Sequence, residues 1–157
     1  MPSEVAVSLA RAGEALGLHL TIIGHHDRLH RDGRPLIGQR QQSHRGLRVC
    51  DLGFGPQCTA HCRWQVNHRL ASRPEPFATR CWKGVREIAV PLSCDGHHLG
   101  TLYAGAWRQA VPPRSAAELP DAWLDAWRAL PLWHDGLLAA LAPVLAPFAD
   151  GLALRLA

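Results

Sequence analysis

The most regular alternation of apolar and polar positions in the chain lies between residues 85 and 107. Apolar side chains alternate with other residues over 85–92 and again over 99–107, a period typical of β-strands with one face in a core. Asp95 and Gly96 fall between the two runs, and Asp-Gly flanked by apolar runs favours a two-residue hairpin turn. The pattern therefore predicts an antiparallel hairpin, around which we expect the rest of the chain to be organised.

The first part of the chain shows a helical period followed by a strand period. Apolar residues recur at helical spacing over residues 3–17, where Ser3 can cap the start and Gly17 can end the helix. Residues 18–23 alternate and predict a strand. A further short strand is expected around residues 36–37, paired with this first strand.

Three more helices are predicted from apolar spacing. They cover residues 57–70, 120–130 and 134–157. The last of these contains Pro143 and Pro147, and each proline removes a helical hydrogen-bond donor. We therefore expect a kink there, or a split into two shorter helices.

Composition and charge narrow the classes of function. The 157 residues, of which 47% are hydrophobic, fit one domain of the α+β class, and the net charge is +4. The basic residues are scattered arginines with a single lysine, Lys83, so direct nucleic-acid binding is not expected. The amino end does not resemble a signal peptide and no apolar run has the length of a membrane span, so we expect a cytoplasmic protein without a membrane contact.

Five cysteines carry the most distinctive chemistry, because a cytoplasmic protein keeps its thiols reduced. Cys50, Cys58, Cys62 and Cys81 could together bind zinc or an iron–sulfur cluster, although their spacing is not a specific signature. Free cysteine is also a common small apolar core residue, so both interpretations stay open. Cys94, beside the predicted turn, is the expected bystander.

Signs of catalysis are scarce. The sequence has no phosphate-binding glycine loop, no nucleophile elbow and no zinc-protease helix, so we expect a binding protein and not an enzyme. Among the six tryptophans, Trp82 next to Cys81 is the one expected to face a pocket.

One group of residues resembles a known family. The segment combines Cys81-x-x-Gly84, the run Glu87-Ile88-Ala89-Val90-Pro91-Leu92, then Gly96, Leu99-Gly100 and Gly105. In this order and spacing it resembles the PocR sensory domain, and upstream Cys50 and Cys62 resemble the two earlier cysteines of that family. The resemblance covers about residues 4–110. It departs from the family at Trp82, where a histidine is usual, and at the additional Cys58.

The resemblance implies a single PocR-like domain over 1–157, with its core at about 4–110 and a helical tail at about 118–157. Its fold would be a PAS-like antiparallel sheet with helices on one side, enclosing a pocket for simple organic compounds. The residues expected nearest the ligand are Cys50, Cys62, Cys81, Trp82 and Gly84. Such domains occur in bacterial transcription regulators and histidine kinases.

The expected function is thus a cytoplasmic small-molecule sensor that takes part in signal transduction or transcription regulation. It would act through a regulatory protein partner or as a homodimer. A metal or iron–sulfur redox sensor, with Cys50, Cys58, Cys62 and Cys81 as ligands, is the alternative on the same fold. A third hypothesis is an interaction protein that dimerises through its C-terminal helices.

Overall fold

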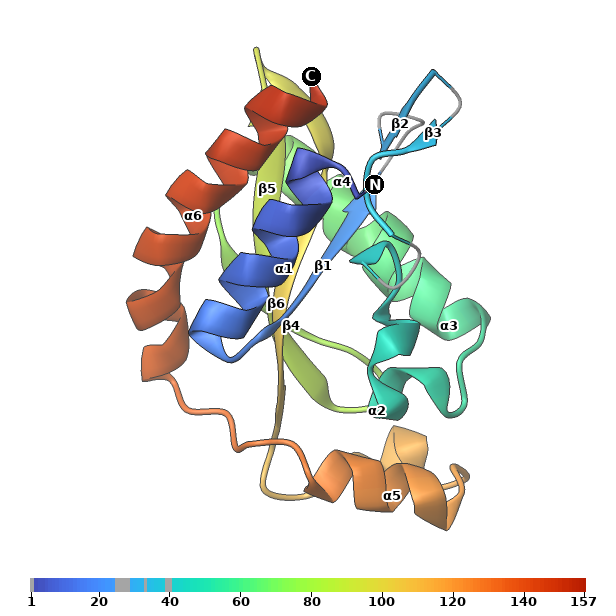
Figure 1. Ribbon diagram of the computed structural model, residues 1–157. Coiled ribbons are helices and arrows are strands. Elements are labelled where there is room, and N and C mark those ends of the chain that lie inside the picture. Colours follow the sequence, from blue (N-terminus) through green and yellow to red (C-terminus); the bar gives the residue numbers. More distant parts are fainter. Residues whose placement is uncertain (1, 25–28, 33, 39–40) are drawn as a thin grey trace.

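A four-stranded antiparallel sheet, with the strand order β1-β6-β5-β4, forms the centre of the molecule (Figure 1). The structure is a computed structural model that describes residues 2–24, 29–32, 34–38 and 41–157. The strands are β1 His19–Gly24, β4 Phe77–Arg80, β5 Val85–Cys94 and β6 His97–Arg108. This architecture confirms the predicted α+β class with an antiparallel sheet, flanking helices and a C-terminal helical segment.

The predicted hairpin is the β5–β6 pair. Cys94 pairs with His97, which leaves Asp95 and Gly96 as a two-residue turn. Both turn residues have positive φ, 50° and 76° respectively, as a turn that matches the twist of the strands requires. The register shifts between Arg86 and Glu87, so a bulge interrupts the alternation of side chains near the start of β5.

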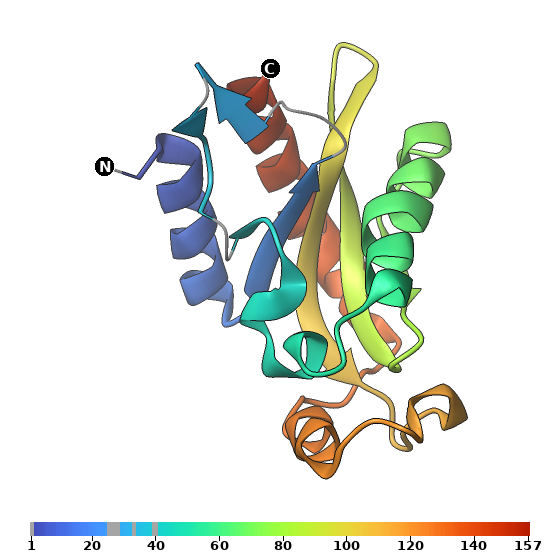
Figure 2. The same ribbon diagram turned by 90° about the vertical axis from the view of Figure 1, so that its right-hand side faces the viewer.

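Helices α1 (Glu4–Leu16) and α6 (Gly136–Leu156) cover one face of the sheet (Figures 1 and 2). The Ser3 side chain caps α1 by accepting a hydrogen bond from the Ala6 amide at 3.1 Å, and Gly17 ends the helix with a φ of 64°. The helices bury their apolar residues against alternate positions of the strands. This core contains Val5, Leu9, Leu20, Ile22, Ile88, Val90, Leu92, Leu102, Leu145, Ala149 and Leu152.

The predicted split of the last helix does not occur, because α6 runs unbroken over 21 residues. Pro143 and Pro147 are both exposed, so the carbonyl groups that lose their partners lie on the solvent side and can bind water. Leu145 and Ala149, on the opposite side of the helix, are fully buried and hold it on the sheet.

Helix α6 is long and apolar enough to cross a membrane by length and composition alone, which corrects the expectation that no segment reaches that length. In the fold its inner side belongs to the core beneath the sheet. The absence of a membrane contact stays a prediction.

A helical segment covers the other face of the sheet. It consists of α3 (Pro56–Thr59), the π-helix η4 (Ala60–Gln65) and α4 (Val66–Ser72). Val66 and Leu70 of α4 pack against Ala89 and Tyr103 of the strands. The helix predicted over 57–70 is confirmed, but the expected arrangement with helices on one side of the sheet is wrong. The reason is that β5 and β6 are apolar on both faces and so need a cover on each.

The short strand expected around residues 36–37 is also wrong. The strands in this region are β2 (His30–Arg31) and β3 (Arg34–Pro35), which pair with each other and not with β1. The carbonyl of Leu36 accepts a hydrogen bond from the Ser3 hydroxyl, and that of Ile37 accepts one from the Gln42 side chain. The Leu36 amide donates to the carbonyl of Leu29 beside the β2–β3 pair, and side chains bind the carbonyls of Leu36 and Ile37, so these groups do not pair with β1.

The remaining elements gather at one end of the sheet. They are η3 (His44–Gly46), α2 (Arg48–Asp51), η5 (Arg114–Ala116) and α5 (Asp121–Arg128), the last of which confirms the helix predicted over 120–130. Trp123 and Trp127 of α5 are buried with Val49 of α2 and Val85 of β5 in a second core. This core fixes α2 beside the entry to the central hairpin.

Candidate functional site

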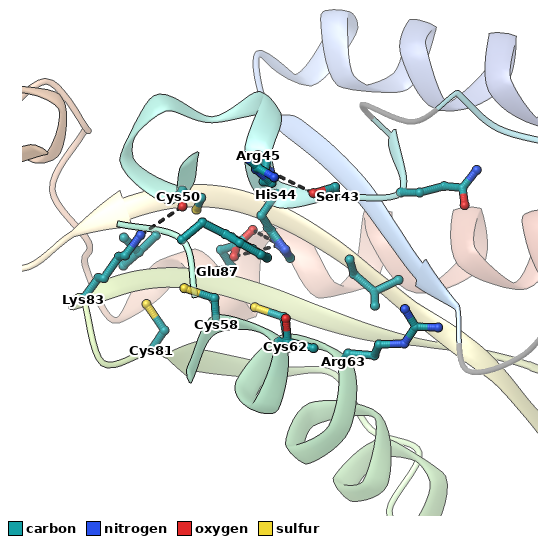
Figure 3. A pocket seen from close by; sticks show the side chains of 15 residues that line it. Ser43, His44, Arg45, Cys50, Cys58, Cys62, Arg63, Cys81, Lys83 and Glu87 are labelled. Atoms are coloured by element: carbon teal, nitrogen blue, oxygen red, sulfur yellow. Dashed lines mark hydrogen bonds and ion pairs between the residues drawn. The ribbon is translucent and has the colours of Figure 1, made fainter. Parts of the chain in front are cut away.

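A cavity of about 310 Å³ lies on the face of the sheet that α3, η4 and α4 cover (Figure 3). Its floor includes Val85 and Glu87 of β5 and Ile23 of β1. Segment 42–45 and α2 form one wall, and the α3–η4 segment forms another. The volume is at the lower end of the range for small-ligand sites, which begins at about 300 Å³.

Four of the five cysteines line this cavity. Cys50 comes from α2, Cys58 from α3, Cys62 from η4, and Cys81 from the turn that follows β4. Figure 3 shows the sulfur atoms of Cys58, Cys62 and Cys81 directed toward the same space. Cys94 lies at the distant hairpin turn and packs against the first core.

The π-helix holds Cys62 in place. The Val66 amide donates to the carbonyl of His61, the five-residue spacing that defines a π turn. The Tyr103 hydroxyl donates a 2.6 Å hydrogen bond to the carbonyl of Cys62, and the Tyr103 side chain is fully buried. The strand β6 therefore anchors the turn of helix that carries Cys62 over the cavity.

Lys83 connects two of the cysteine-bearing segments. Its side chain is buried, with 1% exposed, and lines the cavity. The ammonium group donates hydrogen bonds to the carbonyls of Val49, Cys50 and Leu52, at 3.3, 2.9 and 2.6 Å. Since Lys83 follows Cys81 by two residues, it ties the end of α2, and with it Cys50, to the turn that carries Cys81.

Glu87 and His44 form a buried pair on the cavity floor. Nε2 of His44 lies 3.0 Å from Oε1 and 3.1 Å from Oε2 of Glu87, and about 5% of each residue is exposed. The His44 ring also meets Tyr103 edge to face, with the ring centroids 4.5 Å apart. The pair places a hydrogen-bonding group inside a largely apolar space.

No motif in the sequence predicts this pair or the role of Lys83. Glu87 had a signal, because it is a charged residue inside an apolar strand, and Lys83 had one, because it is the only lysine. His44 had none, since it meets Glu87 across 43 residues of chain.

Trp82 and Gly84, expected near the ligand, are not among the residues that line the cavity. Gly84 has a φ of 72°, and a Cβ atom there would lie 2.7 Å from Cδ of Pro113, so it makes a tight turn against the following loop. The carbonyl of Trp82 accepts a hydrogen bond from the Ser115 hydroxyl. Both residues thus join the Cys81 turn to segment 113–115.

Burial keeps three of the cavity thiols protonated. It is the largest cause that raises the pKa of Cys50, Cys62 and Cys81 above the ordinary value of 9.0, and the Glu87 carboxylate raises each further. The charge of Lys83 opposes this rise at Cys50 and Cys62. At neutral pH these thiols are therefore neutral, polarisable and weakly nucleophilic.

The cavity has side chains of the right type to bind a metal, but in the structure they are not close enough together. Thiols are the right ligands for zinc or an iron–sulfur cluster. Within the described residues, however, no three His, Cys, Asp or Glu side chains are grouped closely enough to hold a metal ion. Binding would require the four thiols to close toward one another and to lose protons.

Three comparisons with known proteins found no similar protein. No family model, curated protein or solved structure matches the chain significantly. The resemblance to the PocR sensory domain thus depends on the sequence motif alone.

Proposed function

We propose that the protein is a small-molecule sensory domain of the PocR type, whose ligand occupies the cavity beneath α3 and η4. The observation that supports this best is the cavity itself, about 310 Å³ in volume, with residues of the motif, Cys81 and Glu87, on its walls together with Cys50 and Cys62. Neutral thiols and aliphatic side chains offer contacts to an apolar ligand, and the His44–Glu87 pair offers one polar contact.

Strand β5 provides a physical link from the cavity to the C-terminal helices. Val85 and Glu87 face the cavity, whereas Ile88 packs in the core with α6 on the opposite face. The Arg86 guanidinium lies 4.5 Å from the centre of the Trp133 ring, just before α6. A ligand that binds one packing arrangement of β5 more tightly than another would shift the population of α6 positions available to a partner.

A thermal-shift screen tests the proposal. A ligand that binds only the folded state must raise the melting temperature. We expect hits among small alcohols, diols, aldehydes and acids, and we expect Cys58→Phe, which fills the cavity, to abolish them. Cys94→Phe is the matched control, because Cys94 lies outside the cavity, and it should keep the shifts. Hits that survive Cys58→Phe, or a screen without any hit, would contradict the proposal.

A cysteine-bound metal or iron–sulfur cluster is the second candidate, favoured by the convergence of Cys50, Cys58, Cys62 and Cys81 on one cavity. Four thiolates complete a tetrahedral zinc site or hold a cluster, and they could report on redox state. The test is metal and sulfide analysis, together with an absorption spectrum, of protein purified without oxygen. These measurements show whether a metal or a cluster is bound. Near-stoichiometric metal that is lost in Cys81→Ser and kept in Cys94→Ser would establish it, and a colourless metal-free protein would refute it.

The third hypothesis, an interaction protein that dimerises through its C-terminal helices, stays a prediction, as does the absence of catalysis. The exposed side of α6 carries Val144 and Leu154, of which 50% and 73% are exposed. Removing α6 is no fair test, because Leu145 and Ala149 belong to the core. Sedimentation analysis of Leu154→Glu is the suitable measurement, and an unchanged mass would contradict dimerisation through this side.

A further inference from the structure

The charges around the cavity do not balance. Among the described residues, three cationic side chains line it, Arg45, Arg63 and Lys83, and one carboxylate does, that of Glu87. Arg45 already has a partner, because its Nε lies 2.7 Å from Asp51. Without Arg45, the described lining residues still carry two cations, Lys83 and Arg63, against the single carboxylate of Glu87.

Lys83 is the less accessible of these two cations. Its ammonium group has three carbonyl partners and, among the described residues, no carboxylate within salt-bridge distance. Three carbonyls use all three of its N–H donors, so it can attract an anion only through space. A buried cation usually has a counter-charge, because the low dielectric makes an isolated one costly.

Of the two cations, Arg63 is the one whose side-chain N–H groups have no hydrogen-bond partner among the described residues. Its side chain is exposed, and its guanidinium lies 5.7 Å from the centre of the Trp64 ring. In Figure 3 Arg63 is at one end of the cavity and Lys83 at the other, with the labelled thiols between them. A guanidinium presents two parallel donors that match a carboxylate.

The thiols do not cancel the excess charge. Burial raises the pKa of Cys50, Cys62 and Cys81, so these groups contribute no negative charge near neutral pH. They instead provide polarisable, weakly polar surface between the two cations.

We propose that the ligand of this cavity is a small organic monocarboxylate. Its carboxylate binds Arg63 at the accessible end, and its short apolar chain lies among the thiols toward Lys83. A negative charge on the ligand offsets the excess of cations, which favours a carboxylate over a neutral alcohol, and the small cavity favours one with a single short chain. This inference rests on the proposed function, since it names the class of ligand for the same site.

Matched acids and amides provide the test, because an amide has nearly the shape of a carboxylate without its charge. Straight-chain monocarboxylates from acetate to heptanoate, with benzoate, are compared with their amides by calorimetry and thermal shift. EDTA is present so that metal–thiolate binding does not interfere. We expect at least one carboxylate to bind about tenfold or more tightly than its amide, as a charge-assisted hydrogen bond would give.

Arg63→Gln should remove most of this preference, and Arg128→Gln, at an exposed position of α5, should leave it intact. Equal binding of acids and amides, an unchanged preference in Arg63→Gln, or no binding by any acid of the series would each overturn the inference. Neutral alcohols that bind where the acids do not would refute the carboxylate while the sensory function stands. If the protein binds neither acids nor alcohols, both the carboxylate inference and the proposed sensory function are refuted.

Discussion

His44 and Glu87 bring together two segments that the chain separates by 43 residues, with Nε2 of His44 only 3.0 Å from Oε1 of Glu87. Both side chains are buried, so neither can use water in place of its partner. The pair joins the loop before α2 to the middle of the sheet, and it forms part of the cavity floor.

We predict that His44→Ala destabilises the protein by about 3–5 kcal/mol, because it leaves the Glu87 carboxylate buried without its partner. Urea unfolding measures this loss. In Glu87→Gln/His44→Ala the buried charge is gone, so the double variant should lose less than the sum of the two single variants. Additive losses would show that the two side chains do not interact.

Lys83→Met should destabilise the protein by roughly 3 kcal/mol, because three carbonyls at the end of α2 lose a charged donor. Lys83→Arg keeps the charge and should lose less. Arg128→Met, at an exposed position of α5, is the control and should stay within about 0.5 kcal/mol of the wild type.

Burial of Lys83 has a second measurable consequence. An amine-reactive reagent should label Lys83, the only lysine, much more slowly in the folded protein than in protein unfolded by urea. Mass spectrometry of peptides measures the two rates. Rapid labelling of Lys83 under native conditions would contradict the carbonyl contacts.

The raised thiol pKa values predict an alkaline loss of stability. Above the ordinary value of 9.0 the thiols ionise in the unfolded chain, while Cys50, Cys62 and Cys81 keep their protons in the folded one. The folded state then binds more protons, so its stability falls as pH rises, by up to about 1.4 kcal/mol per pH unit for each thiol. Below pH 8 this contribution to the pH dependence should vanish.

Unfolding of Cys62→Ala between pH 8 and 10.5 tests the assignment. The variant should show a shallower decline than the wild type. Identical slopes in the two proteins would exclude Cys62 as a cause of the decline.

Gly84 and Gly96 offer a matched pair for the turn that follows Cys81. Both have positive φ, 72° and 76°, but a Cβ at Gly96 meets nothing within 4 Å, whereas one at Gly84 meets Pro113 at 2.7 Å. Gly96→Ala should cost about 1–2 kcal/mol for the backbone conformation. Gly84→Ala should cost about 1–3 kcal/mol more, because the Pro113 loop must move. Equal losses in thermal unfolding would show that the Pro113 contact is unimportant.

Local patterns in the sequence were sufficient for most of the secondary structure. The alternation over 85–107 and the Asp95-Gly96 turn predicted the central hairpin, and Ser3 and Gly17 marked the ends of α1. These features are set by neighbours in the chain, where side-chain period and turn chemistry act directly. The prediction around residues 36–37 failed because the Leu36 amide bonds to the neighbouring Leu29 and the distant Ser3 binds the Leu36 carbonyl, which leaves no pairing with β1.

The sequence also indicated which cysteines belong to the candidate site, but it did not indicate how they are arranged in space. Cys50, Cys58, Cys62 and Cys81 stood out by type, whereas their convergence depends on a π turn anchored by Tyr103 and on three carbonyls held by Lys83. No spacing rule contains such contacts.

The sequence by itself thus determined the central hairpin, β1, α1, the helical segment 56–72, α5 and α6, because these depend on residues a few positions apart. Only the tertiary structure decided that both faces of the sheet are covered, that Trp82 and Gly84 turn toward segment 113–115, and that His44 meets Glu87. The physical reason is that burial and charge pairing act between groups that the fold brings together, whatever their separation along the chain.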